Sequence, residues 1–410
     1  MPITQRLAGK SSFSLFRGKT ALIIGIQIRH SYIVGAKEWP MGTVSQLQNR
    51  IRSPAHRIQS EDEALEIART LAPRFAAAAS DRDINRLLPY DDLDQLWQSG
   101  LAAIAIPAEQ GGLDVPNMLL AEIVTLIAEG DPSIGECLAV HFQALEGLRD
   151  HDNEDLKNRL YARVLEGDRF ASAVMPGQLL LEDEKIGLRL EGQACSTAGL
   201  LYADWIVATS ANGAQSAFIA TESNGLSIVD DWDGMGQRVN GAATVYFDAT
   251  IVEAGSVIRH SQAAMGTTKA MAALLQAAVD LGIARAALAD YKIRGKTNAT
   301  AFGQFALQLD MLSGAMETAG RKLDTAEVNT ADEPIYAALY AASAIGISTS
   351  AAALEISSAL FDLPAGAGGI GLNLDRHWRN ARVRANGSAR EPLLKEAAAY
   401  YGSSLSDRQT

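Results

Sequence analysis

His141 is a candidate for acid–base chemistry in this sequence, because an imidazole changes protonation near neutral pH. It lies in DPSIGECLAVHFQALEGLRD, an apolar segment that predicts a buried helix. A histidine there either packs in the core with its ring nitrogens hydrogen-bonded, or serves an active site as an acid, a base or a positioning group. Trp232 and Arg238 lie in and beside a glycine-rich loop and have the same two interpretations, structural packing or contact with a substrate.

Two glycine-rich motifs resemble phosphate-binding loops but lack the required context. GAGGIG at residues 366–371 has GxGxxG spacing, yet it follows a helical segment rather than a strand. RGKT occurs at residues 17–20 and 294–297, and Phe13 and Asp290 stand where the Walker motif needs its first glycine. The sequence therefore predicts no nucleotide loop of either kind, and no acidic cluster has the spacing of a metal site.

Composition describes an acidic globular protein. The chain has 410 residues, 48% of them hydrophobic, and a formal net charge of -12. An acidic surface disfavours binding to nucleic acid or to an anionic membrane. Cys137 and Cys195 are too few for a disulfide framework, and no apolar run approaches the roughly 20 residues that cross a bilayer. We expect a cytoplasmic protein with neither nucleic acid nor membrane as a partner.

The hydrophobic period divides the chain into an extension and three domains. Residues 1–52 predict a basic extension outside the fold, since the first 60 residues contain nine Lys or Arg and one acid. Residues 53–168 have helical spacing, residues 169–260 form short alternating runs between turn residues, and residues 261–410 return to long Ala-rich helices. We predict an α+β fold with an N-terminal helical domain, a central antiparallel β domain and a C-terminal four-helix bundle, with the active site at their seam.

Several motifs resemble, in order, those of the acyl-CoA dehydrogenase superfamily of flavoproteins. GLAAIAIPAEQGGLDVP is similar to the family segment GL...PxExGG, and GMGQRVNGAATVYFDATIV to LGxRxSxTxxxxFxxVxVP. FGQF at Phe302 and DRHWRNAR at Asp375 complete a resemblance that runs from Ser53 to Tyr400. DPSIG, DDW and DRHWRNAR look most like the flavin-dependent monooxygenase branch that includes dibenzothiophene monooxygenase and the sulfur-acquisition oxidoreductases.

This resemblance implies a two-component monooxygenase that takes reduced FMN from a separate flavin reductase and uses O2 on a small apolar, organosulfur substrate. His141 corresponds to the active-site histidine of the branch. Ser196 and Thr197 correspond to the strand whose hydroxyl contacts the flavin ring. Phe302, in the FG motif, is a further predicted flavin contact, and the resemblance also implies a homotetramer.

Departures from the family patterns bear on the reaction and the cofactor. Dehydrogenases carry a catalytic glutamate where Ser388 stands, and serine cannot abstract an α-proton, which favours oxygenation. The monooxygenase branch has a histidine where Gly387 stands. Ala299 replaces the arginine that dehydrogenases direct at the FAD pyrophosphate, which favours FMN over FAD, and Arg294 and Lys296 can supply the positive charge instead. Two alternatives stay open, an acyl-CoA dehydrogenase with FAD and a non-catalytic member that keeps the fold.

Overall fold

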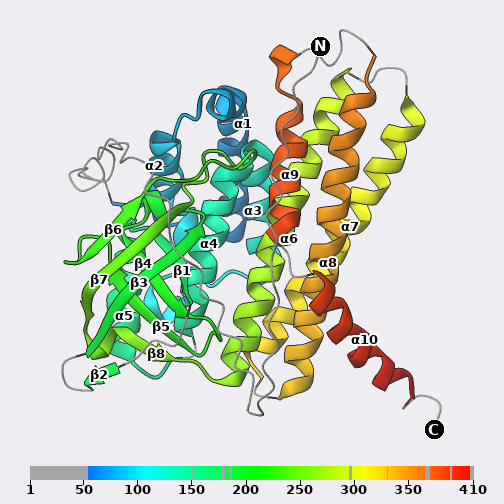
Figure 1. Cartoon of the computed structure of the whole chain (residues 1–410). Helices are drawn as coiled ribbons and strands as arrows, with labels where there is room; N and C mark the ends of the chain where they lie inside the picture. Colours follow the sequence, from blue (N-terminus) through cyan, green and yellow to red (C-terminus); the bar gives the residue numbers. More distant parts are fainter. Residues whose placement is uncertain are drawn as a thin grey trace, which may run out of the picture. The chain divides into compact units, whose positions relative to one another are not determined.

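The computed structural model describes residues 54–149, 151–176, 181–183, 187–294, 298–329, 331–364, 370–387 and 390–406, so the predicted basic extension lies outside the described residues. Helices form both ends of the described chain and strands form its middle (Figure 1). The N-terminal helices are α1 (Glu61–Asn85), α2 (Tyr90–Gln98), α3 (Asn117–Gly130), α4 (Pro132–Arg149) and α5 (Glu154–Leu165).

The boundaries of α1 follow from its capping residues. The Ser60 hydroxyl accepts a hydrogen bond from the backbone N–H of Glu63 at 3.2 Å, and acidic residues occupy the first turn, where the helix dipole favours them. The helix ends at Arg86, whose φ of 50° lies in the left-handed region. Local chemistry of this kind is readable from the sequence.

The middle of the chain forms one mixed sheet. Its strand order is β6-β7-β3-β1-β4-β5-β8, with β2 paired to β3 at the side. The strands are β1 (Phe170–Met175), β2 (Leu181–Asp183), β3 (Gly187–Thr197), β4 (Trp205–Ser210), β5 (Gln215–Ala220), β6 (Leu226–Val229), β7 (Ala243–Val252) and β8 (Val257–Arg259).

The prediction of a purely antiparallel β domain is wrong for the central strand pair. β1 and β4 run parallel, in register from Phe170 opposite Trp205 to Met175 opposite Ser210. The cause is the route of the chain: β3 is antiparallel to β1 and so ends beside the start of β1. A short turn at Leu200–Tyr202 then leads directly into β4 on the other edge of β1, where it runs in the β1 direction.

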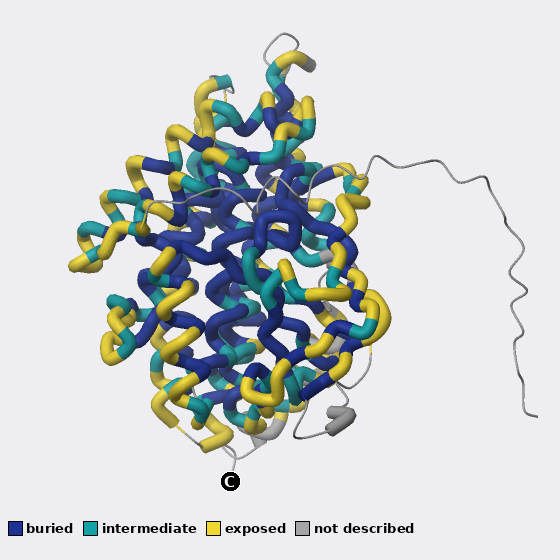
Figure 2. The backbone as a smooth tube through the Cα atoms, turned by 90° about the vertical axis from the view of Figure 1, so that its left-hand side faces the viewer, coloured by how far each residue is buried: buried dark blue, intermediate teal, exposed yellow. Residues whose placement is uncertain are grey.

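The helices and the sheet share one hydrophobic core. Its buried members include Phe75 of α1, Ile206 of β4 and Leu274 of α6 (Gln262–Arg294), each essentially without solvent exposure. α4 packs against both β1 and α6, so it is the element that joins the sheet to the C-terminal helices. Figure 2 shows the buried backbone running through the middle of the described chain, with exposed segments on its outer turns.

The C-terminal bundle consists of α6, α7 (Ala299–Glu327), α8 (Asp332–Ala359) and α9 (Asp375–Gly387), and α10 (Arg390–Ser406) contacts α8. By length and composition alone, α6 and the segment Asp332–Asp362 could cross a membrane. Both belong to the bundle, and 67% of the most apolar window of α6 is buried inside the protein, as in the core helix of a globular domain.

Candidate active site

The positions predicted to contact a flavin lie at the end of β3. Thr197 is paired with Ala243 of β7, and its hydroxyl donates a hydrogen bond to the backbone oxygen of Ser172 in β1. Ser196 precedes it on the same strand. The structure therefore places these two residues next to β1, in the middle of the sheet.

An exposed apolar side chain lies beside them. Val174 of β1 is paired with Cys195 of β3 and is 52% exposed, although both of its neighbours in β1 are buried. An apolar residue this exposed near the centre of a sheet is a platform that a flat ring could cover. The residues present thus fit a flavin ring lying against β1 and β3.

A cavity of about 130 Å³ opens over the same face of β1. It lies between α4, the start of α6 and strands β1, β4 and β5. Its polar lining includes Ser172, Thr209, Ser216, His260 and Lys269.

A chain of hydrogen bonds runs through this cavity. His260 Nε2 lies 2.9 Å from Ser216 Oγ, which in turn lies 3.0 Å from Thr209 Oγ1. Burial lowers the pKa of His260, and the nearby charge of His151 lowers it further, so the imidazole stays neutral at neutral pH. A neutral imidazole joined to two hydroxyls can hold or pass a proton at Nε2.

Sequence reasoning missed His260. A Cβ atom on Gly147 of α4 would lie only 2.9 Å from His260 Cε1, so any larger residue at position 147 would make the imidazole ring shift. The one available signal was position, because His260 stands between β8 and α6, at the junction where the hydrophobic period returns from strand to helix.

His141 is placed in the core, away from this cavity. It is 0% exposed; Nδ1 accepts a hydrogen bond from the backbone N–H of Phe170 at 3.0 Å, and Nε2 lies 3.1 Å from the carbonyl oxygen of Ala102. Burial lowers its pKa from 6.5 to about 3. Because both ring nitrogens are used by the backbone, the geometry argues against the predicted catalytic role and supports the packing interpretation, with His141 joining α4 to the start of β1.

The other predicted flavin contacts lie in the bundle. Arg294 ends α6, where its Nε is buried without a hydrogen-bond partner in the described part of the chain, and Lys292 lies 5.7 Å from the ring centre of Phe302. At about 1.5 Å per residue, Arg294 is about 37 Å along α6 from Lys269 at the cavity. One chain therefore does not bring Arg294 and Phe302 to Thr197, and Lys296 lies outside the described residues.

Trp232 and Arg238 take different places. The Trp232 indole donates from Nε1 to the backbone oxygen of Gln237 at 3.1 Å, which closes the loop and supports the packing interpretation. Arg238 lines a second, larger cavity at the other end of α4. Its Nε is buried and has no partner among the described residues.

A buried ion cluster joins α9 to α4 and α6. Arg384 donates from Nε to Asp280 and from Nη1 to Glu136, both at 2.5 Å, and its Nη2 donates to the backbone and side-chain oxygens of Gln276 at 2.9 and 2.7 Å. Burial raises the pKa of Asp280, and the charge of Arg384 opposes this. The cluster holds the end of α9, and hence the Gly387 position, against the two helices that line the cavity.

The N-terminal region matches a known domain. The family model "Acyl-CoA dehydrogenase, N-terminal domain" matches residues 59–168. The chain is 26% identical over 359 residues to the probable FMNH2-dependent monooxygenase SfnC of Pseudomonas putida, covering 78% of this chain and 90% of that protein. It is 29% identical over 207 residues to the L-evernosamine nitrososynthase of a Micromonospora species, and this match covers 45% of the chain and 49% of the relative.

Solved structures resemble the fold as a whole. The methanesulfinate monooxygenase MsuC of Pseudomonas fluorescens superposes with a TM-score of 0.75 at 23% identity, over 82% of this chain and 96% of that one. The FMN-bound dibenzothiophene monooxygenase TdsC of Paenibacillus sp. A11-2 gives a TM-score of 0.73 at 20% identity over the same shares. These likenesses confirm the α+β fold class predicted from the sequence.

Proposed function

Because residues 59–168 match the acyl-CoA dehydrogenase N-terminal domain and the chain shares the fold of flavin-dependent monooxygenases, we propose that this protein is a two-component flavin monooxygenase. It takes reduced FMN from a separate flavin reductase and uses O2 to oxygenate a small apolar substrate. The observation that carries the proposal is the match to an FMNH2-dependent monooxygenase over 90% of that relative's length. Organosulfur compounds are the proposed substrate class.

The proposed flavin site is the face of β1 and β3. The ring would cover Val174, with Ser196 and Thr197 at its edge. Reduced FMN supplies the electrons that activate O2. The protein orients the ring, keeps water out of the cavity and presents the His260–Ser216–Thr209 chain as a place to hold a proton close to the substrate.

The proposed assembly is a homotetramer in the cytoplasm. Leu307 and Met311 lie one turn apart on α7 and are 69% and 70% exposed, as expected of a face that a second subunit covers. Arg294, Lys296 and Phe302 would then act on the flavin of a neighbouring subunit, in keeping with the distance of Arg294 from the cavity in its own chain.

The decisive experiment combines flavin titration with oxygen labelling. FMN and FAD are titrated into the purified protein, and then NADH, a flavin reductase and ¹⁸O₂ are added with methanesulfinate, dibenzothiophene or an amino sugar. We expect tighter binding of FMN than of FAD in the titration, and ¹⁸O in an organosulfur product after the reductase is added. Label in the amino sugar alone would favour a reaction like that of the nitrososynthase relative.

Two other results would reject the proposal. Anaerobic bleaching of bound FAD by an acyl-CoA would identify a dehydrogenase. A folded protein that binds neither FMN nor FAD would be a non-catalytic member of the fold.

A further inference from the structure

We propose that the cavity between α1, the α3–α4 turn, α6 and α9 binds a small apolar carboxylate, with Arg238 as its anion-binding residue. The cavity has a volume of about 440 Å³, which lies within the range of about 300–1,000 Å³ typical of ligand pockets. This proposal concerns a second site and does not depend on the proposed flavin chemistry.

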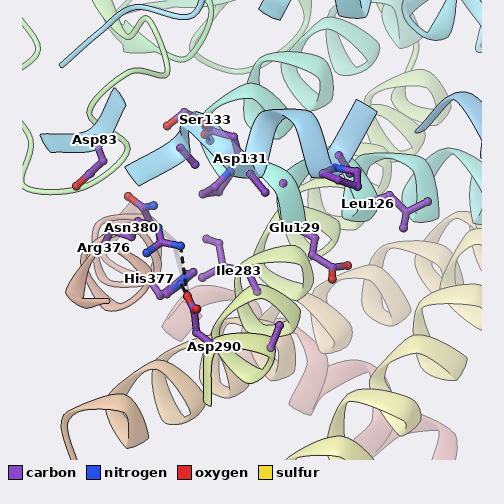
Figure 3. Close-up of a pocket in the computed structure, with 18 of the residues that line it drawn as sticks. Asp83, Leu126, Glu129, Asp131, Ser133, Ile283, Asp290, Arg376, His377 and Asn380 are labelled. Carbon is purple, nitrogen blue, oxygen red and sulfur yellow. Dashed lines mark hydrogen bonds and ion pairs between the residues drawn. The ribbon is translucent and has the colours of Figure 1, made fainter. Parts of the chain in front are cut away.

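The acidic groups around the cavity are already neutralised. Asp83 accepts a hydrogen bond from Arg379 Nη2 at 2.6 Å, and Asp131 accepts one from Arg82 Nε at 3.0 Å. Figure 3 shows Arg376 and His377 directed at Asp290, with His377 Nε2 at 2.8 Å and Arg376 Nη2 at 3.3 Å from its Oδ2. These pairs leave little negative charge to repel an anion.

The Arg238 guanidinium in the cavity, unlike these acids, has no hydrogen-bonded ion pair in the described part of the chain. Arg238 Nε is buried and makes no hydrogen bond within the described ranges, although its charge helps to lower the pKa of Asp83. Arg69 adds an exposed guanidinium to the lining. An unsatisfied buried donor is costly, and an acceptor on a ligand in the cavity would satisfy Arg238 Nε.

Glu129 is the one lining carboxylate placed apart from these pairs. In Figure 3 it lies on the far side of the cavity from Asp83. Burial and the charge of Glu122 raise its pKa, and the charge of Arg285 opposes them. Its charge is opposed by Arg285 rather than by Arg238.

The residues that line the cavity favour a ligand with an apolar group and one negative charge. Ala72, Ala76, Ile283 and Ala286 form much of the remaining surface, and the small alanines leave the space open. Of the three arginines that line the described cavity, Arg69 is exposed and Arg376 is paired with Asp290, so Arg238 is left to bind an anion, and its guanidinium matches one carboxylate bidentately. A doubly charged phosphate would leave part of its charge uncompensated in this partly buried site.

This cavity is distinct from the proposed active site. It contacts α4 at Ser133 and α6 at Ile283, whereas the active-site cavity contacts α4 at Gln143 and α6 at Lys269. At about 1.5 Å per residue these positions are about 15 Å apart along α4 and about 21 Å apart along α6. A ligand in one cavity does not fill the other.

The test uses the full chain without flavin and a matched pair of probes. Benzoate and its neutral analogue benzamide are titrated calorimetrically. We expect benzoate to bind and benzamide to bind at least about tenfold more weakly. Arg238→Met should weaken benzoate binding at least about tenfold, while Arg321→Met, an exposed arginine on α7, should leave it unchanged.

Three outcomes would overturn the proposal: no benzoate binding to the wild type, equal binding to Arg238→Met, or competition by saturating FMN, which would place the anion in the flavin site. Ala286→Phe, which fills the cavity and keeps Arg238, should also abolish binding. It serves as the second variant if Arg238→Met does not fold. If the protein binds benzoate but does not bind FMN, the proposed function is rejected and this inference is not.

Discussion

The pKa of His141 distinguishes a buried structural histidine from a catalytic one. Nδ1 accepts the N–H of Phe170, so protonating it would set two donors against each other in a fully buried place. The folded pKa of about 3 lies below the ordinary 6.5, so the unfolded chain binds the extra proton first. Stability conferred by neutral His141 is therefore complete above pH 6.5 and is lost as the pH falls toward 3.

We expect His141→Asn, whose side-chain oxygen can still accept from Phe170, to reduce this pH dependence. Between pH 4 and 6 the free energy of unfolding should change by about 1.4 kcal/mol less per pH unit than in the wild type. Urea denaturation at several pH values measures it. Phe142→Leu, a buried neighbour without a titrating group, should lower stability at all pH values equally. An unchanged slope in His141→Asn would show that burial does not lower the pKa of His141.

His260 is the residue whose removal should affect turnover. We expect His260→Asn to lower kcat about 10²-fold with little change in FMN affinity, because the variant loses a proton-holding group without altering the β1–β3 face. Since burial and His151 lower the pKa of His260, and Lys269 also faces the cavity, the acidic limb of the wild-type kcat profile should lie below pH 6.5. That limb should be absent from the variant. If His260→Asn keeps the wild-type kcat, the hydrogen bonds between His260, Ser216 and Thr209 have a structural role and no role in turnover.

At the scale of elements, Arg384 determines how α9 is held. We expect Arg384→Met to lower the free energy of unfolding by about 3–5 kcal/mol, because Asp280 and Glu136 would stay buried without their shared counter-ion. Adding Asp280→Asn to this variant should recover part of the loss. Arg321→Met, which breaks an exposed pair with Glu317, should cost about 0–1 kcal/mol in the same urea titration. Equal effects of the two arginine variants would contradict this account.

At the scale of the whole molecule, the exposed face of α7 predicts self-association. We expect Leu307→Glu combined with Met311→Glu to break the tetramer, because charge would be placed on apolar side chains that are 69% and 70% exposed in the single chain. FMN affinity should fall with it if Phe302 reaches a neighbouring flavin. Light scattering and flavin fluorescence measure both, and Glu317→Lys, which changes an exposed charge on another face of the same helix, is the control. Unchanged mass in the double variant would reject this interface.

The sequence by itself determined the order of helices, strands and helices and the likeness to acyl-CoA dehydrogenases and their monooxygenase branch. Hydrophobic period, capping residues such as Ser60 and short motifs are local properties, so they can be read without coordinates. The flavin contacts at Ser196 and Thr197 remain predictions of that kind.

Only the tertiary structure decided which polar groups meet. The parallel pairing of β1 with β4, the burial of His141, the contact of His260 with Ser216 and the cluster around Arg384 all join residues distant in sequence. Burial and partnership set a side chain's pKa and its chemistry, and both arise only when separate elements pack together.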